Sequence, residues 1–263
     1  MAMQRVSDGC WLCVWGLLLS AGLAVAHPLP SRIVSLDLCS DWLLAHYAPG
    51  SQSVTYSPMV RRFPLPKALA ERPTHNGSLE QILSLQPDVV LVGEFNAFML
   101  RQRLESLGVK VVVMPLPQTL DDLAGMELNM LALTGQSASA WPRTTQTVPA
   151  HVSGQSHGRL LLLGPNGYGT GRNTFEDSLI TRAGWVNYIE HNGHVKLDLE
   201  AVAAHPPDAI VWSAPRHAAL ANQFAQHPVL QRAVPPERWI QTDDWRWQCP
   251  GPWMYHLIEQ LQP

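Results

Sequence analysis

The sequence has few charged residues and no excess of positive charge. Only 15% of its 263 residues are charged, and 18 Lys and Arg against 21 Asp and Glu give a formal net charge of −3 at pH 7. Proteins that bind nucleic acid or anionic membranes usually carry a basic patch. The composition therefore argues against nucleic acid and anionic lipid as partners.

The apolar run near the N-terminus is too short for a comfortable membrane span. It covers residues 10–26, which is 17 residues, whereas a spanning helix needs about 20. Arg5 precedes the run, and Ala24-Val25-Ala26 ends it with the small-x-small pattern that signal peptidase accepts. We predict a cleavable signal peptide at residues 1–26 and export to the periplasm; an uncleaved anchor is the alternative.

Cysteine is scarce, and two of the four cysteines lie in the predicted signal peptide. The mature chain keeps only Cys39 and Cys249, a pair in an oxidising compartment. They could form a disulfide, which would stabilise the fold by on the order of 4 kcal/mol and restrict any cleft that it crosses. They could instead ligate a soft metal as thiolates, or remain free thiols.

Motifs of several enzyme classes are absent. The chain has no H-E-x-x-H. Its "NGYGTG" segment, in which the glycines predict a turn, lacks the full G-x-G-x-x-G order of a dinucleotide site. The histidine pair of "HNGH", residues 191–194, falls in a polar turn away from the predicted strand ends, so we expect no metal site there. An enzyme is therefore not expected, although a catalytic pair of Asp37 and Asp243 stays open.

The chain contains an internal repeat at an offset of 120 residues. The stretch "SLEQILSLQPDVVLV" begins at Ser78, and "DLEAVAAHPPDAIVW" begins at Asp198. In both, a helix is followed by Pro-Asp and an apolar strand that suits the interior of a parallel sheet. Ser78, with Gln81 three residues on, has the spacing of a capping box. Two copies of one α/β unit predict two similar lobes.

The rest of the mature chain alternates short apolar strands with helical segments. We predict an α/β fold of two small open α/β lobes joined by a long helical connector, with a ligand cleft between the lobes. The expected boundaries are residues 27–118 for the N-terminal lobe, 119–157 for the connector and 158–263 for the C-terminal lobe. Pro142 should break or kink the connector helix.

Ligand sites of open α/β sheets lie beyond the carboxyl ends of the strands. The segments expected there are rich in aromatic residues and arginines, which suit a bulky, partly planar, oxygen-rich or anionic ligand. The candidates from these segments are Asp37, Cys39, Ser40, Tyr56, Arg61, Phe95, Tyr168, Arg172, Arg216, Asp243, Trp245 and Trp247.

Six stretches in chain order carry a family resemblance: "RIVSLDLCSDWLLAHYAPG", "SLEQILSLQPDVVLVG", "LESLGVKVVV" with "TLDDL", "YGTGRNTFEDSLITRAGWVN", "LEAVAAHPPDAIVW" and "TDDWRWQCPGP". This set resembles the cobalamin and iron-siderophore group of substrate-binding proteins of ABC importers. The resemblance implies two lobes on one backbone helix, limited hinge motion, a monomer and a ligand at the lobe interface. It also implies a pocket lined by residues 37–40, 168–172 and 243–247. The first of these segments adds Leu38 to the candidate ligand contacts.

Such proteins dock on their permease through one acidic residue per lobe. The first lobe offers Glu94 or Glu105, but the second has no acid between Asp208 and Glu237, so no docking pair is assigned. We expect a periplasmic binder that captures a metal chelate, siderophore-like or corrinoid-like, for an ABC importer permease, with no cofactor of its own. The alternative is a periplasmic metal-handling or redox protein built around Cys39 and Cys249.

Overall fold

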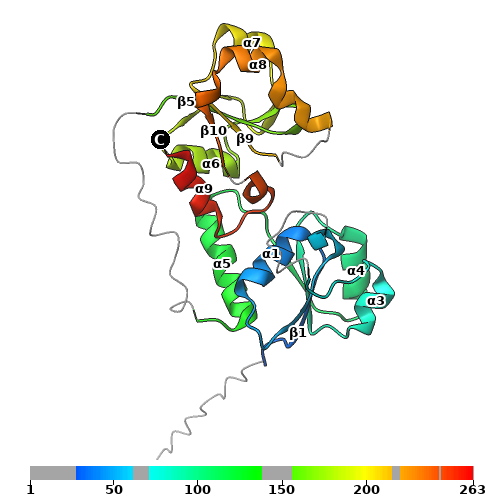
Figure 1. The fold of residues 1–263 in the computed structure, drawn as a ribbon. Coiled ribbons are helices and arrows are strands. Elements are labelled where there is room, and N and C mark those ends of the chain that lie inside the picture. Colours follow the sequence, from blue (N-terminus) through cyan, green and yellow to red (C-terminus); the bar gives the residue numbers. More distant parts are fainter. Residues whose placement is uncertain (1–27, 62–70, 138–155, 215–219, 243, 263) are drawn as a thin grey trace, which may run out of the picture.

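The computed structural model describes residues 28–61, 71–137, 156–214, 220–242 and 244–262. In these residues, two α/β lobes are joined by a column of helices (Figure 1). The first lobe contains, in chain order, β1 (Arg32–Ser35), α1 (Leu38–Tyr47), β2 (Ser53–Thr55), η1 (Pro58–Arg61), α3 (Leu79–Ser84), β3 (Val89–Gly93), α4 (Phe98–Ser106) and β4 (Val111–Met114). Its sheet has the order β2-β1-β3-β4, and every pair is parallel. The predicted α/β class is confirmed.

The second lobe is built on a mixed sheet. Its elements are β5 (Arg159–Leu163), η3 (Pro165–Gly167), β6 (Tyr168–Thr170), α6 (Phe175–Arg182), β7 (Val186–Asn187), β8 (His194–Lys196), α7 (Leu199–Ala204), β9 (Ala209–Trp212), η4 (Leu220–Gln226), α8 (Pro228–Ala233), η5 (Pro236–Arg238) and β10 (Trp239–Ile240). The order is β10-β9-β5-β6-β8, with β7 beside β5. The pairs among β10, β9, β5 and β7 are parallel, whereas β6 runs antiparallel to both β5 and β8.

The Gly-rich segment that opens the second lobe corrects one expectation. The sequence predicts a turn there, but residues 168–170 form β6. Just beyond it, a Cβ at Gly171 would lie 2.1 Å from the carbonyl oxygen of His191, so only glycine permits this close approach of the two backbones. Glycine is needed here because two backbones approach each other closely. The turn was predicted because the same glycines, seen in the sequence alone, are also typical of a turn.

The internal repeat is confirmed, because α3 with β3 and α7 with β9 occur at the same offset. The helices begin at side-chain caps: Ser78 accepts from Gln81 N and Asp198 accepts from Ala201 N. The predicted capping box at Ser78 is only half formed, since the Gln81 side chain accepts a bond from Asn76 N.

The aspartate of each repeat joins the unit to the first strand of its lobe. Asp88 Oδ2 accepts from Arg32 N at 2.9 Å, and Asp208 Oδ2 accepts from Arg159 N at 2.7 Å. Each arginine in turn donates to the carbonyl oxygen two residues before its aspartate, Arg32 to Gln86 and Arg159 to Pro206. The Pro-Asp pattern therefore sets the register between the repeated strand and its neighbour.

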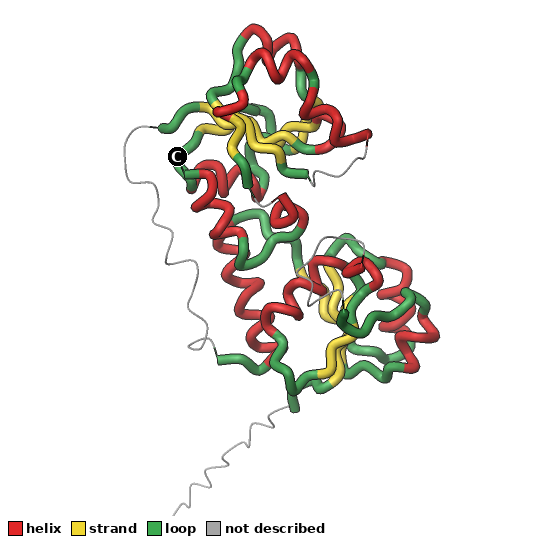
Figure 2. Tube along the Cα trace, viewed as in Figure 1, coloured by secondary structure: helices red, strands yellow, loops and turns green. Residues whose placement is uncertain are grey.

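A column of three helices connects the lobes (Figure 2). It consists of α5 (Leu120–Thr134), α9 (Met254–Leu261) and α6. Thr119 and Asp122 form a reciprocal capping box at the start of α5, and Gly135, with φ 71°, ends it. The predicted break near Pro142 lies outside the described residues.

One hydrophobic core runs through this column. It includes Leu91 of the first sheet, Met130 of α5, Ile258 of α9, Leu179 of α6 and Leu160 of the second sheet, all fully buried. The two lobes are therefore held by continuous apolar packing as well as by the chain itself.

Candidate functional site

The carboxyl ends of the two sheets converge on the segment before α9, which contains η6 (Asp244–Gln248). The Gln248 side chain donates to the carbonyl oxygen of Ser213, which follows β9, at 3.3 Å. The carbonyl oxygen of Gln248 lies 3.7 Å from Sγ of Cys39, at the start of α1. Residues that follow strands of both lobes thus meet around one short segment.

A disulfide fastens this segment to the first lobe. Cys39 and Cys249 are bonded with an S–S distance of 2.11 Å and a Cα–Cα distance of 5.1 Å, across 210 residues of sequence. Cys249 is fully buried beside Leu38 and Trp42. The disulfide hypothesis is confirmed, and the thiolate-ligand and free-thiol hypotheses are wrong for the bonded pair, because both sulfurs are in the bond.

Asp37, which the sequence places among the ligand contacts, caps α1 in the structure. Its Oδ1 accepts from the N–H groups of Cys39 and Ser40 at 3.0 Å, and its Oδ2 accepts from Ser40 Oγ at 2.9 Å and Gly93 N at 2.6 Å. Four donors from within the lobe occupy this buried carboxylate. It fixes the start of α1 against the end of β3.

Asp41 lies one turn further along α1 and is completely buried. Its carboxylate accepts from Ser57 N at 2.8 Å and Ser57 Oγ at 2.6 Å. Burial raises the pKa of Asp41 to about 6, although the bonds from Ser57 oppose this rise. Nearby, His75 Nε2 bonds the Ser35 carbonyl oxygen, and burial lowers the pKa of this histidine.

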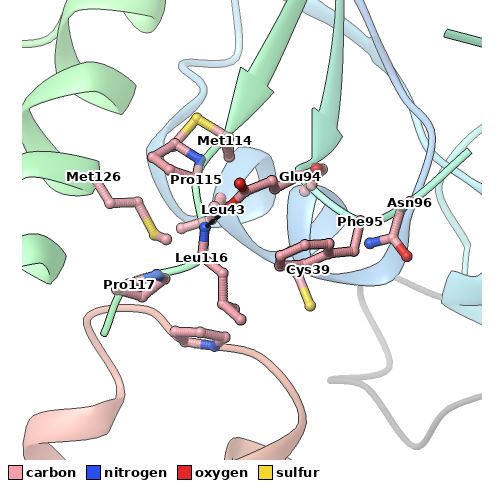
Figure 3. A pocket seen from close by; sticks show the side chains of 13 residues that line it. Cys39, Leu43, Glu94, Phe95, Asn96, Met114, Pro115, Leu116, Pro117 and Met126 are labelled. Atoms are coloured by element: carbon pink, nitrogen blue, oxygen red, sulfur yellow. Dashed lines mark hydrogen bonds between the residues drawn. The ribbon is translucent and has the colours of Figure 1, made fainter. Parts of the chain in front are cut away.

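A hollow opens beside the disulfide, between the loops that follow β3 and β4 (Figure 3). It has a volume of about 70 Å³ and is lined by Cys39, Ser40, Leu43, Gly93, Glu94, Phe95, Asn96, Met114, Pro115, Leu116, Pro117, Met126 and Pro250. Phe95 is 76% exposed and Leu116 is 46% exposed. Large apolar side chains therefore face solvent at the carboxyl end of the first sheet.

The second lobe presents its own exposed apolar side chains beyond β5 and β9. Tyr168 follows β5 and η3 and is 48% exposed, and Leu220, at the start of η4, is also exposed. Lys196 Nζ lies 5.4 Å from the ring centroid of Tyr168 and 5.2 Å from that of Phe224. This ammonium group between two rings holds the η3 and η4 loops together.

Several predicted contact residues belong to the protein interior. Tyr56 is 4% exposed in the core of the first lobe, and Leu38 and Trp247 are buried as well. Trp247 Nε1 donates to Thr242 Oγ1 at 2.9 Å. Arg61 is exposed at the end of η1, whereas Arg216, Asp243 and the side chain of Trp245 lie outside the described residues.

Arg172 does not share a loop with Tyr168, which corrects the grouping predicted from sequence. Because β6 runs antiparallel to β5, with Leu163 opposite Gly169, the chain beyond Tyr168 returns toward the amino end of β5. Four residues of extended chain span about 13 Å. Arg172 Nη2 instead lies 3.9 Å from the Glu190 carboxylate, and its backbone pairs with residues 191–193.

Sequence reasoning missed the loop after β4 and the contribution of α5. Met114, Pro115, Leu116 and Pro117 line the hollow, as does Met126 of α5. The signal was available, because "VKVVVM" is a parallel strand and its carboxyl end must lie on the same edge as that of β3. The position of Met126 depends on helix packing, which the sequence does not show.

Within the described ranges, no three His, Cys, Asp or Glu side chains come together in a way that could hold a metal ion. His191 and His194 are among the described residues, and they belong to no such group. In the same ranges, every helix is too short or too polar to cross a bilayer.

Comparisons with known proteins agree with this architecture. A family model described as periplasmic binding protein matches residues 51–236. Among curated proteins, none matches the chain.

Solved structures share the fold over most of its length. A periplasmic heme-binding protein from Pseudomonas aeruginosa is 25% identical, with a TM-score of 0.66 over 89% of this chain and 91% of that one. A possible iron-binding, periplasmic solute-binding protein from Staphylococcus epidermidis is 19% identical, with a TM-score of 0.67 over 89% and 97%. The vitamin B12 binding protein BtuF of Vibrio cholerae is 19% identical, with a TM-score of 0.63 over 88% and 95%.

Proposed function

The chain belongs to the periplasmic binding protein family, and from this premise we propose that it captures a metal chelate between its lobes and delivers it to an ABC importer permease. The proteins of this family are solute-binding proteins and not enzymes. The chelate would be the cargo, siderophore-like or corrinoid-like, and the protein needs no cofactor of its own. A predicted signal peptide at residues 1–26 would export the chain.

One observation carries the proposal: exposed apolar side chains follow strands of both sheets. Phe95 and Leu116 stand at the carboxyl end of the first sheet, and Tyr168 and Leu220 at that of the second. The contacts of Gln248 with Ser213 and Cys39 bring these two edges toward one segment. A bulky ligand held there would remove apolar surface of both lobes from water.

The ligands of the similar proteins support a chelate as cargo. The similar protein from Pseudomonas aeruginosa binds heme, and the similar protein from Vibrio cholerae binds vitamin B12. Both are large metal-containing macrocycles, and large ring systems match exposed aromatic and aliphatic walls. A site for a bare metal ion would instead need clustered ligating side chains, of which the described residues supply no group of three.

The test is a binding titration of the purified mature protein with haemin, cobinamide and a ferric siderophore, followed by tryptophan fluorescence. We expect at least one chelate to bind, and Tyr168→Ala to weaken its binding by about tenfold through lost ring contact. The matched control is Val186→Ala, because Val186 is similarly exposed at 46% but pairs with Arg159 at the amino end of β5.

An unchanged affinity in the control and a weakened affinity in Tyr168→Ala would support the cleft assignment. If wild-type protein binds none of the chelates, or if both variants bind as wild type does, the proposal fails.

A further inference from the structure

We infer that the hollow beside Cys39 is a subsite for one uncharged hydrocarbon arm or edge of the ligand. The inference rests on the proposed function, because it names the part of a chelate that this wall of the site receives. It narrows the cargo to chelates whose metal is surrounded by a largely hydrocarbon periphery.

The size of the hollow fits a substituent and not a whole chelate. Its volume is about 70 Å³, whereas pockets that enclose a complete small-molecule ligand have roughly 300–1,000 Å³. The body of the chelate must therefore remain outside, against the exposed faces of Phe95 and Leu116 at the rim.

The lining of the hollow is chemically suited to hydrocarbon. Met114 and Met126 supply thioethers on one side, Phe95 an aromatic ring on the other, and Leu43 and Leu116 aliphatic groups (Figure 3). Unbranched, polarisable methionine side chains adapt to irregular apolar groups. Prolines 115, 117 and 250 add apolar surface without an N–H group that would need a partner.

The polar groups of the hollow disfavour an anionic arm. None of the described residues that line it is Lys, Arg or His. Its one acidic side chain, Glu94, accepts a hydrogen bond from Leu116 N at 3.1 Å and so stays at the wall (Figure 3). A carboxylate or catecholate group placed here would meet a like charge and no cation.

The hollow is continuous with the place where the lobes meet. Cys39 and Pro250 belong to its wall, and they stand at the disulfide that joins the first lobe to the C-terminal segment. Gln248, two residues before Pro250, contacts Ser213 of the second lobe. An arm in the hollow would therefore anchor a ligand that also reaches the second lobe.

The experiment compares two probes that differ in their periphery. Haemin has a macrocycle with hydrocarbon substituents along part of its edge, and a ferric tris-catecholate has a compact anionic surface. The variants are Phe95→Ser and Leu116→Ser, whose exposed positions should leave folding intact. The matched controls are Met99→Ser and Leu128→Ser, equally exposed at 76% and 48% but outside the hollow.

We expect haemin to bind more tightly than the tris-catecholate, and each hollow variant to weaken haemin binding by about tenfold while the controls change it less than about twofold. Tighter binding of the tris-catecholate would overturn the inference. Haemin binding that is equally strong in the hollow variants and the controls would overturn it as well, and would leave the proposed function intact. Failure of wild-type protein to bind any chelate would remove the proposed function itself.

Discussion

Asp37, the cap of α1, and Asp41, in the first turn of α1, have different surroundings. Asp37 accepts four hydrogen bonds, one of them from Gly93 at the end of β3. Asp41 accepts two from Ser57 and is completely buried, so the raised pKa of its carboxyl group reflects desolvation. Both carboxylates accept hydrogen bonds from groups of the protein, and both hold loops at the carboxyl end of the first sheet.

Asp41 should make the folded protein less stable as pH rises. Its pKa is raised from 3.8 to about 6 in the folded state, so the folded protein binds this proton more strongly than the unfolded chain does. Its contribution to the free energy of unfolding is therefore largest below pH 4, falls as pH rises to about 6, and then stays constant. The shift corresponds to roughly 3 kcal/mol.

Asp41→Asn should remove this pH dependence, since an amide does not ionise. We expect the free energy of unfolding of the variant, relative to wild type, to rise by roughly 2 kcal/mol between pH 4 and pH 7, because part of the shift lies below pH 4. Urea unfolding at both pH values measures it. His75 titrates in both proteins and cancels in the difference. A difference that is independent of pH would show that Asp41 is not buried as an acid with a raised pKa.

The contacts of individual side chains could be predicted only in part from the sequence. Asp37 and Ser40 were expected at the cleft because they follow a strand, and that position is correct. The use of their side chains was not predictable, because the decisive partner of Asp37 is Gly93, 56 residues away. Tyr56 was also expected at the cleft, and its ring is buried in the core, because position after a strand does not tell whether a ring turns inward.

At the scale of elements, the Pro-Asp of each repeat ties a strand to its neighbour. Asp88 accepts bonds from Ser31 N, Ser31 Oγ, Arg32 N and the Arg32 guanidinium group, whereas Asp208 accepts one from Arg159 N. These bonds lower the pKa of Asp88 to about 2, with the Ser31 hydroxyl as the largest cause. More hydrogen bonds at the strand ends of the first lobe therefore depend on Asp88 than depend on Asp208 in the second lobe.

Asp88→Ala should therefore lower the urea midpoint at pH 7 more than Asp208→Ala does. Each substitution leaves strand-end N–H groups without their carboxylate partner, and Asp88→Ala leaves more of them. Asp121→Ala, at an exposed position in the first turn of α5, is the control and should change the midpoint least. An order in which Asp208→Ala is the more damaging would contradict the hydrogen-bond count.

Periodicity and capping predicted most helices and strands because they are local signals. The repeated helix-strand unit and a helix that begins near residue 119 occur where the sequence placed them. The strand β6 was missed because it is stabilised by β8, whose residues are about 25 positions further along the chain. Its direction then carried Arg172 away from Tyr168, which no local pattern could show.

At the scale of the whole molecule, the disulfide and the shared core limit how the lobes move. Cys39 and Cys249 join α1 to the C-terminal segment, and apolar packing continues from one sheet through α5, α9 and α6 to the other. We infer that ligand binding changes the loops at the strand ends more than the arrangement of the lobes.

Cys39→Ser combined with Cys249→Ser should lower the free energy of unfolding by on the order of 4 kcal/mol, because the unfolded chain regains the freedom that a 210-residue loop had lost. Denaturant unfolding of the oxidised wild type and the double variant measures this. The reduced wild type is the control and should match the variant. If oxidised and reduced wild type unfold at the same denaturant concentration, the bond does not restrict the unfolded chain.

The central claim is that the protein carries a metal chelate. Native mass spectrometry of protein recovered from a bacterial periplasm, with the absorption spectrum of the same sample, tests it most directly. We predict a species heavier than the mature polypeptide by the mass of one chelate, with a visible absorption band of its metal centre. A protein that carries only bare metal ions, or an organic solute without metal, would contradict the account.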